Sequence, residues 1–179
     1  MTTKNNPDLN TTPIDDELNK KEQEQTEQIE QKEIDTFELK FNTRRNERIS
    51  AFNFLYAVDR SDYQTDLSEV IKNFEIGFNI QIPEKSFALQ LAHSAIENRD
   101  ALDQQINPHL KNWKLERLGC CTKLILYMSL WELNQPDAVP SIVINEAVEL
   151  AKMFAEKDAY KFINGILDEI CKTKGDKHE

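Results

Sequence analysis

Apolar residues recur at helical spacing along most of the chain after residue 44. In residues 44–59, one helical face carries the apolar side chains of Ile49, Phe52, Leu55, Tyr56 and Val58. Side chains three or four positions apart share a face of an α-helix, so this spacing predicts a first helix.

Three shorter segments follow the first helix. We predict a short helix over residues 66–74, a helix from Pro83 and Glu84 to about Asn98, and another over residues 99–106 that ends before Pro108. The inward face of the second of these carries Phe87, Leu91, Ala92 and Ala95. Apolar and polar residues alternate over residues 76–83 as in a β-strand. Pro83 and the lack of a convincing partner strand nevertheless favour an extended connector.

Residues 115–133 are apolar on nearly every side of a helix. A helix that is apolar all round is buried by its neighbours, which predicts the central helix of a bundle. Lys123 and Glu132 make this segment a poor membrane helix, and no stretch reaches membrane-spanning length.

The last two predicted helices have the clearest apolar stripes, at residues 143–154 and 162–170. Gly165 lies within the second, where glycine costs about 1 kcal/mol relative to alanine, so we expect it to allow close approach of another helix. The pattern as a whole predicts an all-α fold of about seven helices without a sheet.

Residues 1–43 contrast with this domain because they have few apolar groups and carry 5 Lys against 11 Asp and Glu, a net charge of −6. Ordering them would cost conformational entropy with little burial in return, which predicts a disordered acidic tail. The end of this tail carries Phe37, Leu39 and Phe41. These residues fit either a short extended segment that packs on the domain surface or a docking motif. We therefore divide the chain into a tail (1–43), a helical domain (44–174) and a short C-terminal tail (175–179).

Composition indicates a cytoplasmic protein with reduced thiols. Its three cysteines, Cys120, Cys121 and Cys171, have neither metal-ligand nor C-x-x-C spacing, and the N-terminus has no apolar run typical of a signal peptide. The net charge of −10 weighs against nucleic-acid binding, although a local basic patch can serve on an acidic protein.

No catalytic arrangement stands out. The four glycines form no phosphate-binding loop, and the three histidines are isolated in the sequence. Glu146 and Glu149 have helical spacing, which a solvated helix face explains better than a metal pair. We expect no enzyme activity, no cofactor and no metal.

Arg44, Arg45 and Arg48 cluster at the start of the first predicted helix. Cations there oppose the helix dipole, whereas guanidinium groups beside free N–H groups suit phosphate oxygens. The alternative is that the arginines neutralise the protein's own acidic tail.

Two blocks give a family resemblance: INEAVELAK at residues 144–152 and KFINGILD at residues 161–168. With the arginines ahead of Leu55-Tyr56, and weaker matches at Leu102-Asp103 and at residues 131–133, the domain resembles the NusB family of bacterial transcription antitermination factors.

The resemblance implies an all-α bundle of two packed helical subdomains and a role in binding. NusB-like proteins pair with the ribosomal protein NusE to bind boxA RNA, and act indirectly with other Nus factors and RNA polymerase. Carried over by position, the RNA-binding residues are Arg44, Arg45, Arg48, Asp158, Lys161 and Phe162, and the NusE-binding residues are Tyr56, Glu116 and Thr122.

The chain departs from the family pattern in three places. Asn46 replaces a common third consecutive arginine, one residue is missing between Pro140 and Ile144, and the acidic tail lies outside the pattern. Besides an antitermination factor, two readings remain: a detached RNA-binding domain like that of ribosomal RNA methyltransferases, and a protein-interaction module that has lost RNA binding.

Overall fold

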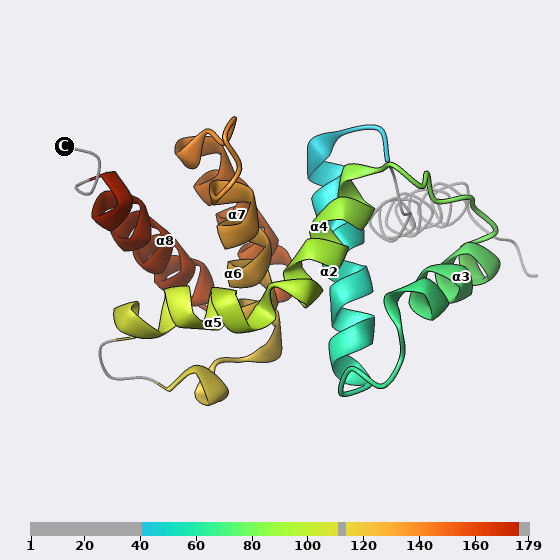
Figure 1. The fold of residues 1–179 in the computed structure, drawn as a ribbon, viewed down its shortest axis with the longest axis horizontal. Coiled ribbons are helices and arrows are strands. Elements are labelled where there is room, and N and C mark those ends of the chain that lie inside the picture. Colours follow the sequence, from blue (N-terminus) through green and yellow to red (C-terminus); the bar gives the residue numbers. More distant parts are fainter. Residues whose placement is uncertain (1–40, 111–113, 176–179) are drawn as a thin grey trace, which may run out of the picture. The chain divides into compact units, whose positions relative to one another are not determined.

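The computed structural model describes residues 41–110 and 114–175, with side chains up to residue 173 (Figure 1). Over these residues the chain forms seven α-helices, two short 3₁₀ helices and no strand, which confirms the predicted all-α fold. The α-helices are α2 (Arg44–Arg60), α3 (Leu67–Phe78), α4 (Phe87–Glu97), α5 (Arg99–Ile106), α6 (Cys120–Leu133), α7 (Pro140–Phe154) and α8 (Ala159–Gly175), and the 3₁₀ helices are η1 (Asn107–His109) and η2 (Leu115–Arg117).

Helix α6 is the central helix, as its apolar sequence predicts. It packs against α2, α4, α5, α7 and α8, and all its residues from Leu124 to Leu130 are buried. The structure starts this helix at Cys120, later than the predicted residue 115, because residues 115–117 form the separate helix η2.

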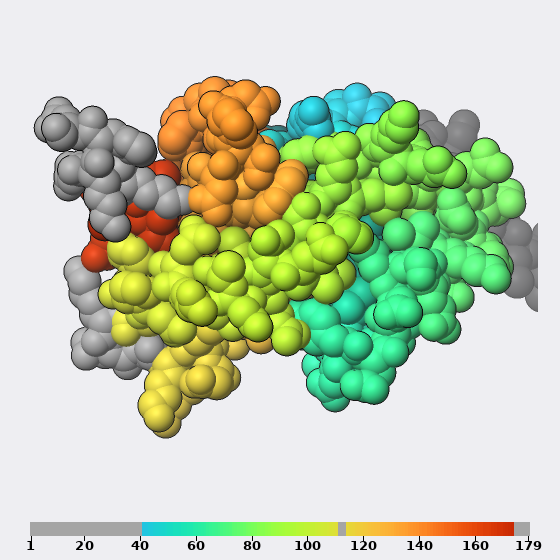
Figure 2. Space-filling view, viewed as in Figure 1, coloured from blue at the N-terminus to red at the C-terminus, as the bar shows by residue number. Residues whose placement is uncertain are grey.

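The helices form two groups around α6, in agreement with the two subdomains implied by the resemblance. Helices α2, α3 and α4 make one group, and α5, α7 and α8 pack with α6 in the other (Figure 1). The space-filling view shows the start of α2 in blue at the same edge of the domain as α7 in orange (Figure 2). This edge carries the candidate site.

Two predicted boundaries near the connector are wrong. Helix α3 continues to Phe78, through residues assigned to an extended connector, and ends where Asn79 adopts a left-handed conformation with φ 51°. Helix α4 begins three residues after Glu84, because the Ser86 hydroxyl caps it by accepting a hydrogen bond from Leu89 N–H at 3.3 Å. Capping by a serine side chain decides the start, and the proline at position 83 only shapes the turn before it.

Gly165 also corrects an expectation. A Cβ atom added there would meet nothing within 4 Å, and the residue is exposed. It does not mediate close helix packing. Gly119 is the crowded glycine, since its added Cβ would lie 1.7 Å from Glu156 Oε1.

The acidic tail is predicted over residues that are mostly outside the described part of the chain. The described region begins with Phe41, which packs against the core, so the prediction for residues 1–40 stands on sequence alone. At the other end, α8 continues to Gly175, the first residue of the predicted C-terminal tail.

Candidate nucleic-acid interface

The arginine cluster lies at the first two turns of α2. Thr43 caps this helix, its hydroxyl accepting a hydrogen bond from Asn46 N–H at 3.1 Å. The Asn46 side chain donates to Asn42 Oδ1 at 2.6 Å, so the residue that replaces a common arginine strengthens the local turn. Capping fixes the first turn, from which Arg44 and Arg45 project with exposed side chains.

Arg45 and Arg48 are paired with carboxylates from two other helices. Arg45 Nε donates to both carboxylate oxygens of Glu146, on α7, at 3.0 and 3.2 Å. Arg48 forms a forked pair with Glu132, at the end of α6, and its Nη1 also lies 3.6 Å from Glu146 Oε2. Glu146 therefore belongs to an ion-pair network rather than to a solvated face.

This network sets the charge of the cluster. Hydrogen bonding and the positive charge of Arg45 hold the pKa of Glu146 below its ordinary value, and Arg48 adds to the effect. The sequence left two candidate counter-ions for the arginines, RNA phosphates and the acidic tail. The fold supplies a third, the carboxylates of Glu146 and Glu132. Arg45 keeps a side chain that is 55% exposed, whereas the side chain of Arg48 is 9% exposed. Only Arg44 and Arg45 can reach a phosphate without the buried pair opening.

The second predicted RNA-binding group lies at the start of α8. Lys161 Nζ is 2.8 Å from Asp158 Oδ1, and Asp158 takes a left-handed backbone with φ 68° just before the helix. Lys161 and Asp158 are exposed, while the ring of Phe162 packs partly against the core. The structure thus makes Phe162 mainly a packing residue and leaves the polar pair on the surface.

Helix α7 connects the two groups. Glu146 contacts Arg45, and Lys152 lies six residues further along, about 9 Å at the helical rise per residue. Lys152 Nζ lies 5.8 Å and Lys161 Nζ 5.6 Å from the centre of the Tyr160 ring. Helix α7 thus contacts the arginine cluster through Glu146 and the start of α8 through Lys152, which lies near the Tyr160 ring. Lys152 Nζ is itself paired with Glu149 Oε1 at 2.7 Å. Neither Lys152 nor Tyr160 was predicted as a site residue from the sequence.

The residues predicted to meet NusE have different environments. Tyr56 is 40% exposed and stacks on Phe52, which stacks in turn on Phe154 at 4.4 Å between ring centres. Glu116 is exposed on η2, but Thr122 is buried and donates a hydrogen bond to Glu156 Oε2 at 2.8 Å. Tyr56 and Glu116 are therefore accessible, whereas Thr122 is buried behind the exposed Glu156 to which it donates.

Cys120 lies close to this side, between the start of α6 and the end of α2. Its thiol donates to Asp59 Oδ2 at 2.9 Å, and burial together with this carboxylate raises the pKa of Cys120 to about 12. A thiol held protonated at neutral pH is a poor nucleophile, so Cys120 lacks the environment of a reactive cysteine.

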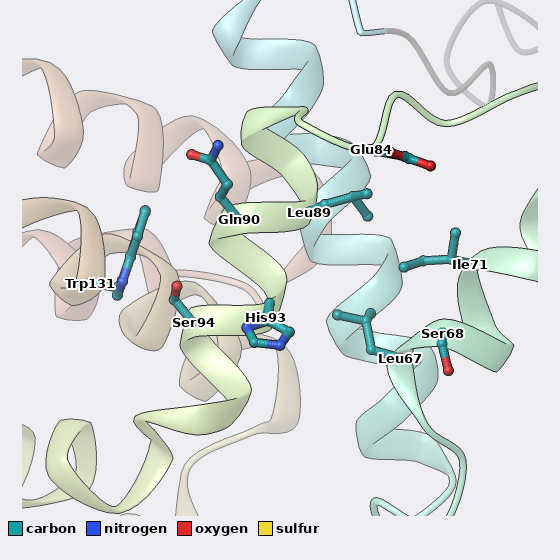
Figure 3. A pocket seen from close by; sticks show the side chains of 9 residues that line it. All are labelled: Leu67, Ser68, Ile71, Glu84, Leu89, Gln90, His93, Ser94 and Trp131. Atoms are coloured by element: carbon teal, nitrogen blue, oxygen red, sulfur yellow. The ribbon is translucent and has the colours of Figure 1, made fainter.

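A cavity of about 500 Å³ lies away from the arginines, between α3 and α4. Figure 3 shows Leu67 and Ile71 of α3 facing Leu89 and His93 of α4. Trp131 lies on the side of α4 that is away from α3. His93 Nδ1 lies 3.0 Å from Glu97 Oε2 on the helix surface, which supports a surface role for this histidine. The cavity has mostly apolar walls and contains no arginine or lysine.

Among the described residues, no three His, Cys, Asp or Glu side chains are grouped so that they could hold a metal ion. None of the described helices is long and apolar enough to cross a membrane.

Comparison with known sequences gives one family. The model of the NusB family matches residues 45–172. The transcription antitermination protein NusB of Macrococcus caseolyticus is 37% identical over 133 residues, which are 74% of this chain and 98% of that protein. The protein of the same name from a Nitratiruptor species is 37% identical over 130 residues, covering 73% of this chain and 92% of the relative.

Solved structures agree with this result. The solved structure of T. maritima NusB has 28% sequence identity to this chain and a TM-score of 0.61, over 73% of this chain and 92% of that one. A chain from a crystal structure of antitermination factors NusB and NusE in complex with double-stranded RNA also has 28% identity and a TM-score of 0.61. That match covers 73% of this chain and 96% of the solved chain.

Proposed function

Because the chain belongs to the NusB family, we propose that it acts as a transcription antitermination factor that binds RNA together with the ribosomal protein NusE. The proposed RNA is a boxA-like element of a nascent transcript, which would place the protein in the cytoplasm. Other Nus factors and RNA polymerase would be indirect partners, and the role is one of binding without catalysis. The similarity to a NusB chain solved with NusE and double-stranded RNA is the observation that carries the proposal.

The surface along α2, α7 and α8 supports an RNA site. Arg44 and Arg45 present exposed guanidinium groups. The exposed Lys152 and Lys161 lie beside the Tyr160 ring, each paired with a carboxylate, Glu149 at 2.7 Å and Asp158 at 2.8 Å. Phosphate contacts supply most of the affinity for nucleic acid, and aromatic rings add stacking with unpaired bases. In this proposal Arg48 holds Glu132 and Glu146 in place, while Arg45 meets the phosphate.

The face around Tyr56 supports a protein partner. Tyr56, Phe52 and Phe154 form a continuous aromatic stack, and Met153 beside Phe154 in sequence is 48% exposed. Aromatic residues and methionine are enriched in protein interfaces. Glu116 adds an exposed charge on η2. We propose that this face meets NusE, with Thr122 orienting Glu156.

A second candidate is a protein-interaction module without RNA binding. The observation in its favour is that Glu146 and Glu132 already neutralise Arg45 and Arg48. RNA would then have to compete with carboxylates for Arg45, which lowers the gain from each contact.

The test is to titrate the full chain with single-stranded boxA-like RNA at several salt concentrations, with and without NusE. We expect Arg45→Ala to weaken binding several-fold and to lower the slope of log affinity against log salt by roughly 0.7–0.9, the loss of one phosphate contact. Its matched control is Arg60→Ala, which removes an exposed arginine in the last turn of the same helix and should change neither quantity.

Arg45→Ala should leave the fold intact, because Glu146 keeps Arg48 as a partner at 3.6 Å. An unchanged slope in Arg45→Ala would move the RNA site to another surface. NusE binding without any RNA binding by the wild-type protein would favour the second candidate.

A further inference from the structure

A small cavity of about 190 Å³ lies beside the arginine cluster and is lined in part by Arg44 and by the ion pair of Arg48 with Glu132. It lies between the start of α2, the start of α4, the end of α6 and the start of α7. The residues that form it are Arg44, Arg48, Phe87, Glu132, Gln135, Asp137, Ala138, Val139, Ile142 and Val143. Four elements that are distant in sequence therefore build one concave site.

Arg48 also lies near the Phe87 ring, with its guanidinium carbon 5.6 Å from the ring centre, but Arg44 is closer to the ring and far more exposed. Its guanidinium lies over the Phe87 ring, 4.2 Å from the ring centre, and its side chain is 66% exposed. Its carboxylate contact is with Glu47, at 3.7 Å. A guanidinium plane supported by an aromatic ring and open to solvent is a stacking platform, and unpaired RNA bases stack on arginine planes.

The wall of the cavity is apolar and exposed. Val139 is 49% and Ile142 55% exposed, and both line the cavity together with Phe87. Two exposed aliphatic residues next to a cationic cluster have no use in binding phosphate, whose charge would lose hydration against them. Clustered apolar surface of this kind marks a place for an uncharged group.

Opposite charges compensate each other at the inner side of the cavity. Arg48 and Glu132 both line it, and they form the forked ion pair whose side chains are 9% and 15% exposed. Gln135 Nε2 donates to the Trp131 carbonyl at 2.9 Å, and its amide oxygen and the carboxylate of Asp137 are acceptors in the lining. An uncharged ring that carries amino groups suits this combination.

We propose that this cavity receives one unpaired nucleobase of the RNA strand, stacked on Arg44 and packed against Val139 and Ile142. This proposal rests on the proposed RNA-binding function. It adds that, next to the phosphate bound by Arg45, one base of the RNA strand enters the cavity. The volume is below the roughly 300–1,000 Å³ of sites that enclose whole small molecules, which suits a single base of a longer chain.

The experiment uses the full chain and a single-stranded boxA-like RNA, together with a set of the same RNA in which one base at a time is removed. Arg44→Lys keeps the charge but removes the plane, and Ile142→Ser removes the apolar wall from an exposed position. Ile76→Ser is the matched control, because Ile76 is an exposed isoleucine on α3, 70% exposed. Circular dichroism checks that each variant is folded.

We expect Arg44→Lys and Ile142→Ser each to weaken binding about five- to tenfold with an unchanged salt slope, because the lost contact is with a base. Ile76→Ser should bind like the wild type. Removal of one particular base should weaken wild-type binding by a similar factor and should weaken the two variants little further.

Variants that bind like the wild type, or additive losses at every abasic position, would overturn the base site while the proposed function stands. A loss in Ile142→Ser that affects NusE binding alone would assign the cavity to a protein and also overturn it. Wild-type protein that binds no RNA would overturn the proposed function together with the base site.

Discussion

Arg48 shares its position at the start of α2 with two exposed arginines, yet the fold gives it a different task. Its side chain is 9% exposed and is held by Glu132 and Glu146, from α6 and α7. Exposed ion pairs contribute little to stability, whereas removing one partner of a buried pair leaves a charge without compensation. Arg45, with a 55% exposed side chain, belongs to the first class and Arg48 to the second.

We predict that Arg48→Met destabilises the domain by roughly 3 kcal/mol, because Glu132 would stay buried without its partner. The double variant Arg48→Met with Glu132→Leu should recover most of this loss, since apolar side chains can replace a buried ion pair at little cost. The measurement is the free energy of unfolding in urea at pH 7, with Arg45→Ala as the control that costs under about 1 kcal/mol. A single variant as stable as the wild type would show that Glu132 has other compensation.

At the scale of elements, capping explains three helix boundaries that apolar periodicity does not define. Ser86 starts α4 and Thr43 starts α2 by accepting hydrogen bonds from backbone N–H groups. Asn79 stops α3 with a left-handed backbone. Apolar periodicity can extend past the end of a helix. A cap marks the boundary more closely, because it satisfies backbone groups that the helix leaves unpaired at its ends.

The glycines of α8 and of the α6 N-cap lead to opposite predictions. Gly165 is exposed in a helix interior with nothing within 4 Å of an added Cβ, so Gly165→Ala should stabilise by up to about 1 kcal/mol and Gly165→Leu should be tolerated. Gly119→Ala should destabilise by about 1 kcal/mol, because the new Cβ displaces Glu156 from the buried Thr122 hydroxyl. Thermal and urea unfolding measure both. A marked loss in Gly165→Leu would restore the expectation of close helix packing there.

For the whole molecule, the distribution of charge matters more than its sum. The net charge of −10 includes −6 from residues 1–43, and the domain adds carboxylates that pair directly with the arginine cluster. RNA binding would therefore work against two sets of carboxylates, one fixed by the fold and one joined to Arg44 through the chain. Salt screens the attraction of Glu132 and Glu146 for the arginines only weakly, because these side chains are in direct contact. Charges on the tail act over longer distances, at which salt screens the interaction well.

We predict that deleting residues 1–40 tightens RNA binding several-fold at low salt and much less at high salt, because tethered acidic residues compete with phosphates at high effective concentration. NusE binding should hardly change, because the residues proposed to meet NusE around Tyr56 are not the ones proposed to bind RNA. The control replaces the acidic residues of the tail with Gln and Asn at unchanged length, and it should reproduce the effect of the deletion. Equal RNA affinity of full-length and shortened protein at low ionic strength would make the tail a bystander.

The sequence by itself determined the all-α fold, the central place of α6 and the family, because these depend on local periodicity and on motifs within single segments. It also placed Arg44, Arg45 and Arg48 on one helix. The pairing of Arg45 and Arg48 with Glu146 and Glu132 was decided only by the tertiary structure, since residues about 100 and 84 positions apart meet there. The same holds for the cavity beside Arg44, whose walls come from four elements. Local pattern reports which face of a helix is buried, but which side chains meet across that face depends on how the helices pack.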